Sequence, residues 1–241
     1  MNTRKSKRHG FTLVEMLTVM VIIAILASMT VGAVTYAIAY INRTAISVEI
    51  KNMEMALQNY KTKYTEYPPD NQNDVYNHMR RCHKNSDPKF DPTGVNPETA
   101  LVIFLSQRCA NPEKPFDPAR FNPNYTEPLT EGCMEFDKGR LTGTNYTPRN
   151  CTAPYAYFRS EFTNGRGTYS NKTASPGGAK PYYFKDAKGT DTWYGDMKYQ
   201  IISAGLDNQF GGTSQLVNDA TGADLDNIVS FSPMTIKDLK D

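Results

Sequence analysis

Hydrophobic side chains are concentrated in one stretch near the start of the chain. Between Phe11 and Ile41, 24 of 31 residues are hydrophobic, and no charged residue occurs from Met16 to Ile41. A helix over the uncharged part would be about 39 Å long, which exceeds the roughly 30 Å hydrocarbon core of a bilayer. The pattern predicts a membrane-spanning helix, and its length argues against a cleaved secretory signal.

Beyond Ile41 the hydrophobic positions repeat at alternating intervals of four and three residues. They fall on one face of a helix and comprise Ile46, Ile50, Met53, Leu57, Tyr60, Tyr64 and Tyr67. Pro68 and Pro69 forbid the helix from continuing. We therefore predict one helix from about Phe11 to Tyr64, in which residues 11–41 cross the membrane and residues 42–67 form an amphipathic half packed on a domain outside it. A coiled-coil stalk is the alternative interpretation.

The remainder of the chain predicts a small mixed domain. Residues 68–154 contain 12 of the 15 prolines and one apolar run, Thr99 to Ser106, which Asn96 and Pro97 introduce as a short helix. Residues 155–241 contain segments with strand patterns at 155–162, 181–185, 198–203 and 228–231. The expected fold class is α+β: a long helix packed on a small antiparallel sheet, with a loop-rich insertion.

Composition indicates a thin core outside the apolar helix. Hydrophobic residues make up 39% of the chain, but only about a third of the 210 residues outside Phe11–Ile41, below the roughly 45–50% of a typical globular chain. Lys and Arg number 27 against 25 Asp and Glu. Because the charges nearly balance and no basic aromatic patch stands out, we expect no nucleic-acid binding.

The N-terminal leader and one acidic residue restrict the interpretation of the apolar helix. Arg4, Lys5, Lys7 and Arg8 occur without an acidic neighbour in residues 1–10, which predicts a cytoplasmic N-terminus and a C-terminal domain on the other side. Glu15 lies just inside the apolar run, where an unpaired carboxylate costs on the order of 2–4 kcal/mol. Glu15 therefore needs a partner.

The string Gly10-Phe11-Thr-Leu-Val-Glu15, preceded by the basic leader, resembles the class III signal of type IV pilins and type II secretion pseudopilins. The resemblance implies that a prepilin peptidase cuts after Gly10 and methylates Phe11, which removes residues 1–10. It also implies that residues 11–41 assemble a filament in which Glu15 pairs with the N-terminal amine of a neighbouring subunit. Processing would leave 23 basic and 25 acidic residues, a formal net charge of −2. An unprocessed signal anchor is the alternative.

Four cysteines lie in the loop-rich insertion: Cys82, Cys109, Cys133 and Cys151. Their even number and an oxidising compartment predict two disulfides. Neighbour pairing, Cys82 with Cys109 and Cys133 with Cys151, closes the shortest loops, although all three connectivities remain open. A zinc site formed by His78, Cys82, His83 and Cys109 is the alternative.

The C-terminal part contains a glycine-rich turn, Ser203 to Gly212, which includes Asp207 and is followed by Asp219, Asp224 and Asp226. Calcium binds six to eight oxygen ligands, and this segment could supply several. It resembles the calcium-binding C-terminal loop of major pseudopilins. The resemblance implies calcium as a cofactor, with ligands among these four aspartates. A solvated turn without an ion is the alternative.

These resemblances imply a filament subunit rather than an enzyme. The expected protein is a type II secretion pseudopilin, anchored by a single pass in the bacterial inner membrane. Its expected partners are further copies in a homo-oligomeric filament, the prepilin peptidase, an inner-membrane assembly platform and minor pseudopilins. A type IV pilin or minor pilin for adhesion, motility or DNA uptake is the first alternative. A membrane-tethered enzyme or binding domain is a remote one, since the chain lacks a Gly-x-Ser-x-Gly elbow and only His78 and His83 lie beyond the leader.

Overall fold

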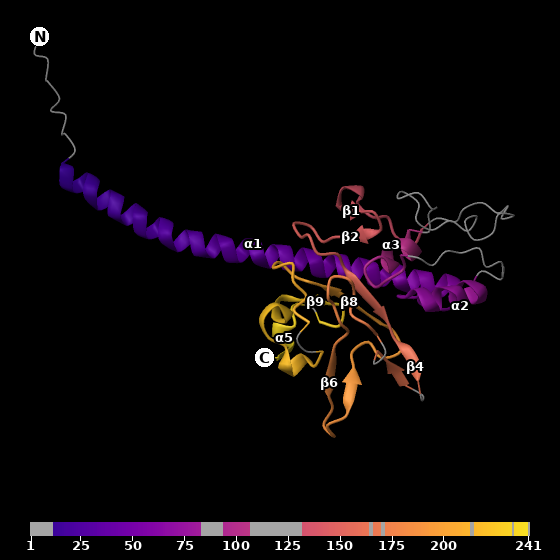
Figure 1. Cartoon of the computed structure of the whole chain (residues 1–241). Helices are drawn as coiled ribbons and strands as arrows, with labels where there is room; N and C mark the ends of the chain where they lie inside the picture. Colours follow the sequence, from indigo (N-terminus) through magenta and orange to yellow (C-terminus); the bar gives the residue numbers. More distant parts are fainter. Residues whose placement is uncertain are drawn as a thin grey trace, which may run out of the picture. The chain divides into compact units, whose positions relative to one another are not determined.

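The structure, a computed structural model, describes residues 12–82, 94–106, 132–163, 166–169, 172–212, 215–232 and 234–240. The chain divides into two compact units, Met1–Ile41 and Asn42–Asp241. The first contains the apolar part of the long N-terminal helix. The second contains the rest of that helix and all other elements (Figure 1).

The long helix α1 spans Leu13–Tyr64, so the predicted helix is confirmed from Leu13 to its end; Phe11 lies outside the described residues. It ends because Thr65 adopts a left-handed backbone conformation with φ 68°, and the following Pro68 and Pro69 cannot be accommodated in a helix. The six buried residues of α1 lie in the second unit and match the predicted stripe closely: Ile46, Ile50, Met53, Ala56, Leu57 and Tyr60.

Helices α2 and α3 come next along the chain. Helix α2 (Gln72–Cys82) lies in the segment that the sequence predicted to be loop. Helix α3 (Ala100–Leu105) confirms the predicted short helix, and five of its six residues are buried. Asn96 begins the turn before α3, since its side-chain oxygen accepts a hydrogen bond from the Glu98 amide at 2.9 Å.

Within the described residues, the strands form four small antiparallel sheets rather than one. The largest has the order β3 (Ala156–Arg159), β8 (Tyr199–Ser203) and β9 (Ile228–Val229). The other three are hairpins: β1 (Leu141–Thr142) with β2 (Asn145–Tyr146), β4 (Glu161–Thr163) with β5 (Arg166–Thr168), and β6 (Tyr183–Lys185) with β7 (Asp191–Trp193). The described residues also contain the short helical turns η1 (Lys138–Arg140), η2 (Val217–Asp219) and η3 (Gly222–Asp226) and helix α5 (Lys237–Lys240).

The three-stranded sheet is buried on both faces. Tyr157 and Ile201 point to one core, which also contains the buried stripe of α1 and helix α3. Phe158 and Ile202 belong to a second core with residues of η2 and the C-terminal segment. Neighbouring residues of a strand point to opposite faces, so β3 and β8 connect the two cores. The predicted packing of one sheet face on the helix is confirmed, and the fold is α+β.

Candidate functional site

The start of α1 forms a capping box between Thr12 and Glu15. The Thr12 backbone amide and hydroxyl both donate to Glu15 Oε2 at 2.8 Å. The Glu15 amide in turn donates to Thr12 Oγ1 at 3.2 Å. This reciprocal pattern satisfies backbone donors that the first turn of a helix leaves open. Glu15 therefore has a partner within its own chain, which the Thr-x-x-Glu spacing could have revealed from the sequence.

The following part of α1 presents apolar side chains on all sides. Large exposed hydrophobic residues follow one another from Leu13 to Ile41. The hydroxyl groups of Thr18, Ser28, Thr30 and Thr35 donate to backbone carbonyls three or four residues earlier; Thr18 Oγ1, for example, donates to the Val14 carbonyl at 2.8 Å. The helix is long and apolar enough to cross a membrane. A surface of this kind is stable in a bilayer or against other apolar helices.

A comparison with known families accounts for this combination of cap and apolar helix. Residues 5–31 match the family model of the prokaryotic N-terminal methylation motif. The chain carries a class III signal. Together with the long N-terminal helix, this motif fits a pilin-like, membrane-anchored protein that a prepilin peptidase processes for filament assembly. No curated protein and no solved structure matches the chain. The expected cleavage residues Gly10 and Phe11 lie within the motif but outside the described residues.

In the second unit, Glu49 of α1 holds the segment that contains β1 and β2. Its carboxylate accepts hydrogen bonds from Tyr155 Oη at 2.6 Å and Tyr146 Oη at 2.8 Å. Arg140 donates to both carboxylate oxygens and to Tyr146 Oη, with one bond of 2.9 Å to Glu49 Oε2. The Arg140 guanidinium also lies over the Tyr146 ring, 4.5 Å from its centroid. We call these four residues the Glu49 clamp.

Electrostatic interactions within the clamp favour the charged carboxylate of Glu49 and the neutral phenols of Tyr146 and Tyr155. Burial raises the pKa of Glu49, but hydrogen bonds from Arg140, Tyr155 and Tyr146 outweigh burial and lower it overall. Burial and the neighbouring carboxylate raise the pKa values of Tyr146 and Tyr155. At neutral pH the clamp therefore contains one carboxylate, one guanidinium and two neutral phenols, an arrangement that fixes loops on α1.

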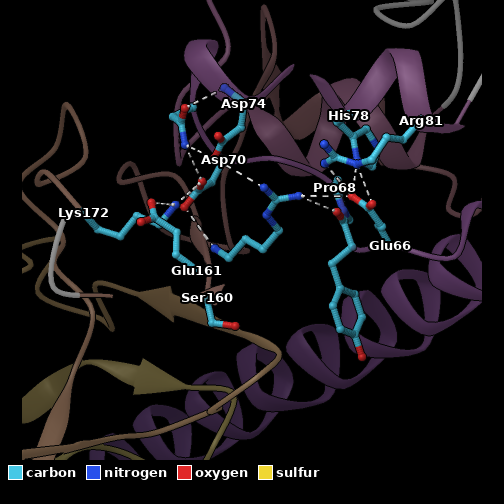
Figure 2. A network of polar contacts seen from close by, with 12 residues as sticks. Glu66, Pro68, Asp70, Asp74, His78, Arg81, Ser160, Glu161 and Lys172 are labelled. Carbon is cyan, nitrogen blue, oxygen red and sulfur yellow. Dashed lines mark hydrogen bonds and ion pairs between the residues drawn. The ribbon is translucent and has the colours of Figure 1, made fainter. Parts of the chain in front are cut away.

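A second polar network surrounds the end of α1 (Figure 2). Lys172 forms ion pairs with Asp70 at 2.7 Å and Glu161 at 3.1 Å, and the side chains of Lys172 and Asp70 are almost fully buried. Arg81 of α2 donates two hydrogen bonds to Glu66, at 2.6 and 2.8 Å. The bonds from Arg81 are the main reason that the pKa of Glu66 is lowered. The network joins α2 and the sheets to the residues after α1.

The zinc alternative receives no support from His78. This residue is buried, its Nε2 lies 2.8 Å from Tyr60 Oη, and its Nδ1 lies 3.5 Å from Glu66 Oε2. Both ring nitrogens thus face protein groups. The other proposed zinc ligands, His83 and Cys109, lie outside the described residues, as does the side chain of Cys82.

Cys133 and Cys151 are half-buried, and their sulfurs are not bonded to each other in the structure. Burial raises the pKa of each thiol, which favours the protonated form. The Cys151 thiol donates a hydrogen bond to the Gly205 carbonyl at 3.3 Å. The other two cysteines, Cys82 and Cys109, have side chains outside the described residues, so the disulfide pattern stays a prediction.

The four aspartates of the expected calcium loop do not converge on one point. Asp226 accepts hydrogen bonds from Arg43 of α1 and from backbone amides, whereas Asp224 is buried against Tyr182. Asp207 and Asp219 are exposed. Among the residues that the structure describes, no three His, Cys, Asp or Glu side chains are arranged to hold a metal ion. The described carboxylates alone therefore form no metal-binding group, and calcium, which also binds backbone carbonyls, stays a prediction.

Proposed function

We propose that this chain is a filament subunit of a type II secretion pseudopilus, which assembles through α1 and acts mechanically rather than as an enzyme. The observation that supports it most directly is the Thr12–Glu15 cap at the start of an apolar helix that carries the methylation motif. The basic leader supports an orientation with the N-terminus in the cytoplasm and the second unit in the periplasm.

The capping geometry leaves Glu15 able to contact a second subunit. Both bonds from Thr12 end on Oε2, and Oε1 makes no hydrogen bond within the described part of the chain. Cleavage after Gly10 would create an ammonium group at Phe11, the residue before Thr12. An ammonium of an adjacent subunit could then pair with Oε1 without breaking the cap. Such a pairing would offset the cost of a carboxylate at the membrane and fix the register of neighbouring helices.

Within the second unit, another face of α1 also suits helix packing. Six exposed positions follow each other at intervals of three and four residues, and none is charged: Ala45, Val48, Asn52, Met55, Asn59 and Thr62. We call them the uncharged stripe. They differ from the buried stripe that faces the domain. This spacing is typical of the seam between packed helices, and the asparagines could pair across it.

The preference for secretion over a pilus rests on the sequence resemblance in residues 203–228, since the N-terminal signal is common to both kinds of filament. A type IV pilin or minor pilin is the second candidate, because the same signal and helix would serve either filament. Inactivating the protein separates the two functions: a pseudopilin is required for export of proteins from the periplasm, whereas a pilin is required for adhesion, motility or DNA uptake.

Mass spectrometry with N-terminal sequencing tests the filament assignment itself. Protein purified from its native membrane should begin at N-methylated Phe11, and Gly10→Leu should yield a full-length precursor. A native protein that retains Met1 would exclude the class III processing on which the proposal rests.

A further inference from the structure

The acidic C-terminal loop lacks positive charge in its own sequence. From Tyr199 to Ile236 no Lys, Arg or His occurs, whereas Asp207, Asp219, Asp224 and Asp226 all lie in this stretch. Acidic residues that are close together repel one another unless a cation, protein donors or solvent compensates their charge. The structure shows what compensates Asp226.

Asp226 is held by four donors from two directions. Arg43 Nε and Nη2 donate to Oδ1 at 3.0 and 2.7 Å. The backbone amides of Leu206 and Asp207 donate to Oδ2 at 2.6 and 3.3 Å. Both oxygens are thus occupied, and the carboxylate joins the glycine-rich turn to α1. The Asp226 side chain is 18% exposed and the Arg43 side chain 32%, so solvent screens the pair only in part.

The turn is shaped around this carboxylate. Gly205 has φ 70°, and a side chain at that position would collide with the backbone carbonyl and the carboxylate of Asp226. Asn208 accepts a hydrogen bond from the Thr152 amide at 2.6 Å, which fixes the far side of the turn. The close approach requires glycine both for conformation and for space.

Asp224 is compensated separately by neutral donors. Its side chain is fully buried, and Oδ1 accepts hydrogen bonds from Gly212 N at 2.9 Å and Tyr182 Oη at 3.1 Å. Tyr182 Oη also accepts a hydrogen bond from Asn227 Nδ2 at 2.7 Å. Asp224 and Asp226 therefore belong to two different sets of contacts.

We propose that Arg43 supplies the positive charge that compensates Asp226, so that the glycine-rich turn closes on α1 without calcium bound at Asp226. Lys180 and Lys240 also reach the loop, but they donate to the backbone carbonyls of Gly212 and Ala220. A divalent ion at Asp226 would have to displace the guanidinium of Arg43 or lie next to it. In the second case the two positive charges would repel each other strongly. An arginine can replace an ion here because its planar guanidinium gives two hydrogen bonds as well as charge. The inference does not depend on the filament proposal.

Thermal unfolding of the full chain in detergent micelles tests this assignment. Trp193, the sole tryptophan, lies in β7 of the second unit and reports on its unfolding by fluorescence. The wild-type Tm should be the same with excess calcium and with a calcium chelator. Arg43→Gln should lower Tm by about 3–6 °C, since one kcal/mol corresponds to roughly 2–4 °C in a domain of this size. The Tm of Arg43→Lys should lie between those of the wild type and Arg43→Gln, because lysine keeps the charge but not the two hydrogen bonds of the guanidinium.

Arg149→Gln is the matched control. Arg149 is exposed in a turn, and its side chain makes no hydrogen bond or ion pair in the described part of the chain, so this variant should melt like the wild type. Asp226→Asn should also lower Tm. In the double variant Arg43→Gln/Asp226→Asn, the decrease in Tm should be smaller than the sum of the decreases in the two single variants. A wild-type Tm that falls on chelation, or an Arg43→Gln variant that melts like Arg149→Gln, would overturn the proposal.

Discussion

The Glu49 clamp allows a quantitative prediction about the stability of the second unit. Replacing Glu49 with Gln keeps the shape of the side chain but removes its charge. The clamp would lose the ion pair with Arg140 and part of its hydrogen bonding to Tyr146 and Tyr155. Hydrogen bonds to charged groups contribute about 1.5–3 kcal/mol each, and breaking a fully buried pair costs about 3–5 kcal/mol.

The side chains of Glu49 and Arg140 are 16% and 20% exposed, which places the expected loss below the fully buried limit. We expect Glu49→Gln to lower the free energy of unfolding by about 2–3 kcal/mol. At about 2–4 °C per kcal/mol, Tm should fall by roughly 4–12 °C. The measurement is thermal unfolding of the full chain in detergent micelles, followed by the fluorescence of Trp193.

The pH dependence adds a second readout. An unfolded Glu titrates near about 4.3, and the pKa of folded Glu49 is lowered. The charged carboxylate thus stabilises the fold fully above about pH 5, and this contribution is lost as the pH falls through the lower folded pKa. The difference in Tm between wild type and Glu49→Gln should therefore shrink in acid.

Glu135→Gln provides the control, because Glu135 is exposed and makes no hydrogen bond or ion pair among the residues that the structure describes. If Glu49→Gln and Glu135→Gln melt at the same temperature at pH 7, the reasoning from buried charge is refuted. Equal differences from wild type at pH 7 and at pH 3 would refute the linkage argument alone.

Three further predictions concern processing and assembly. Gly10→Leu should block cleavage, which a precursor larger by the ten leader residues on a denaturing gel would reveal. Glu15→Leu should insert into the membrane at least as well as the wild type, since a costly charge is removed, but should be absent from sheared or cross-linked filaments; normal incorporation would show that the carboxylate does not set register. Val48→Lys, in the uncharged stripe, should reduce incorporation into filaments at least tenfold without lowering Tm. Met197→Lys is the control and should reduce neither incorporation nor Tm, because Val48 and Met197 are similarly exposed, at 55% and 56%. Equal effects of the two variants on incorporation would exclude a specific role for the stripe.

The parts of the fold that could be predicted from the sequence are those set by local pattern. The heptad-like stripe from Ile46 to Tyr60 and the paired prolines defined α1 almost to the residue. The run from Ala100 to Leu105 defined α3. Helix α2 was missed because its sequence is polar; among the side chains of α2 that the structure describes, Val75 is the one fully buried apolar residue. Its position depends on the Glu66–Arg81 ion pair and on His78, which local pattern does not encode.

The hairpins show the same limit. Each strand of β1–β2 has only two residues, too few for an alternating pattern to be recognised. Their place against α1 depends on Glu49, which lies 91 residues before Arg140 and 97 before Tyr146. Nothing in the sequence around Glu49 distinguishes it from a solvated glutamate on a helix.

Sequence distance also explains why the partner of one carboxylate can be recognised in the sequence and that of another cannot. Glu15 bonds to Thr12, three residues away, and both the family motif and the capping pattern are local. Asp226 bonds to Arg43, 183 residues away, and its nearest basic neighbour in the sequence is Lys237. An acidic segment without local countercharge has the same appearance whether a metal ion, solvent or a distant arginine neutralises it. Because a folded domain must compensate buried or half-buried charge from some source, the arrangement in space decides among these sources, and here it favours the arginine.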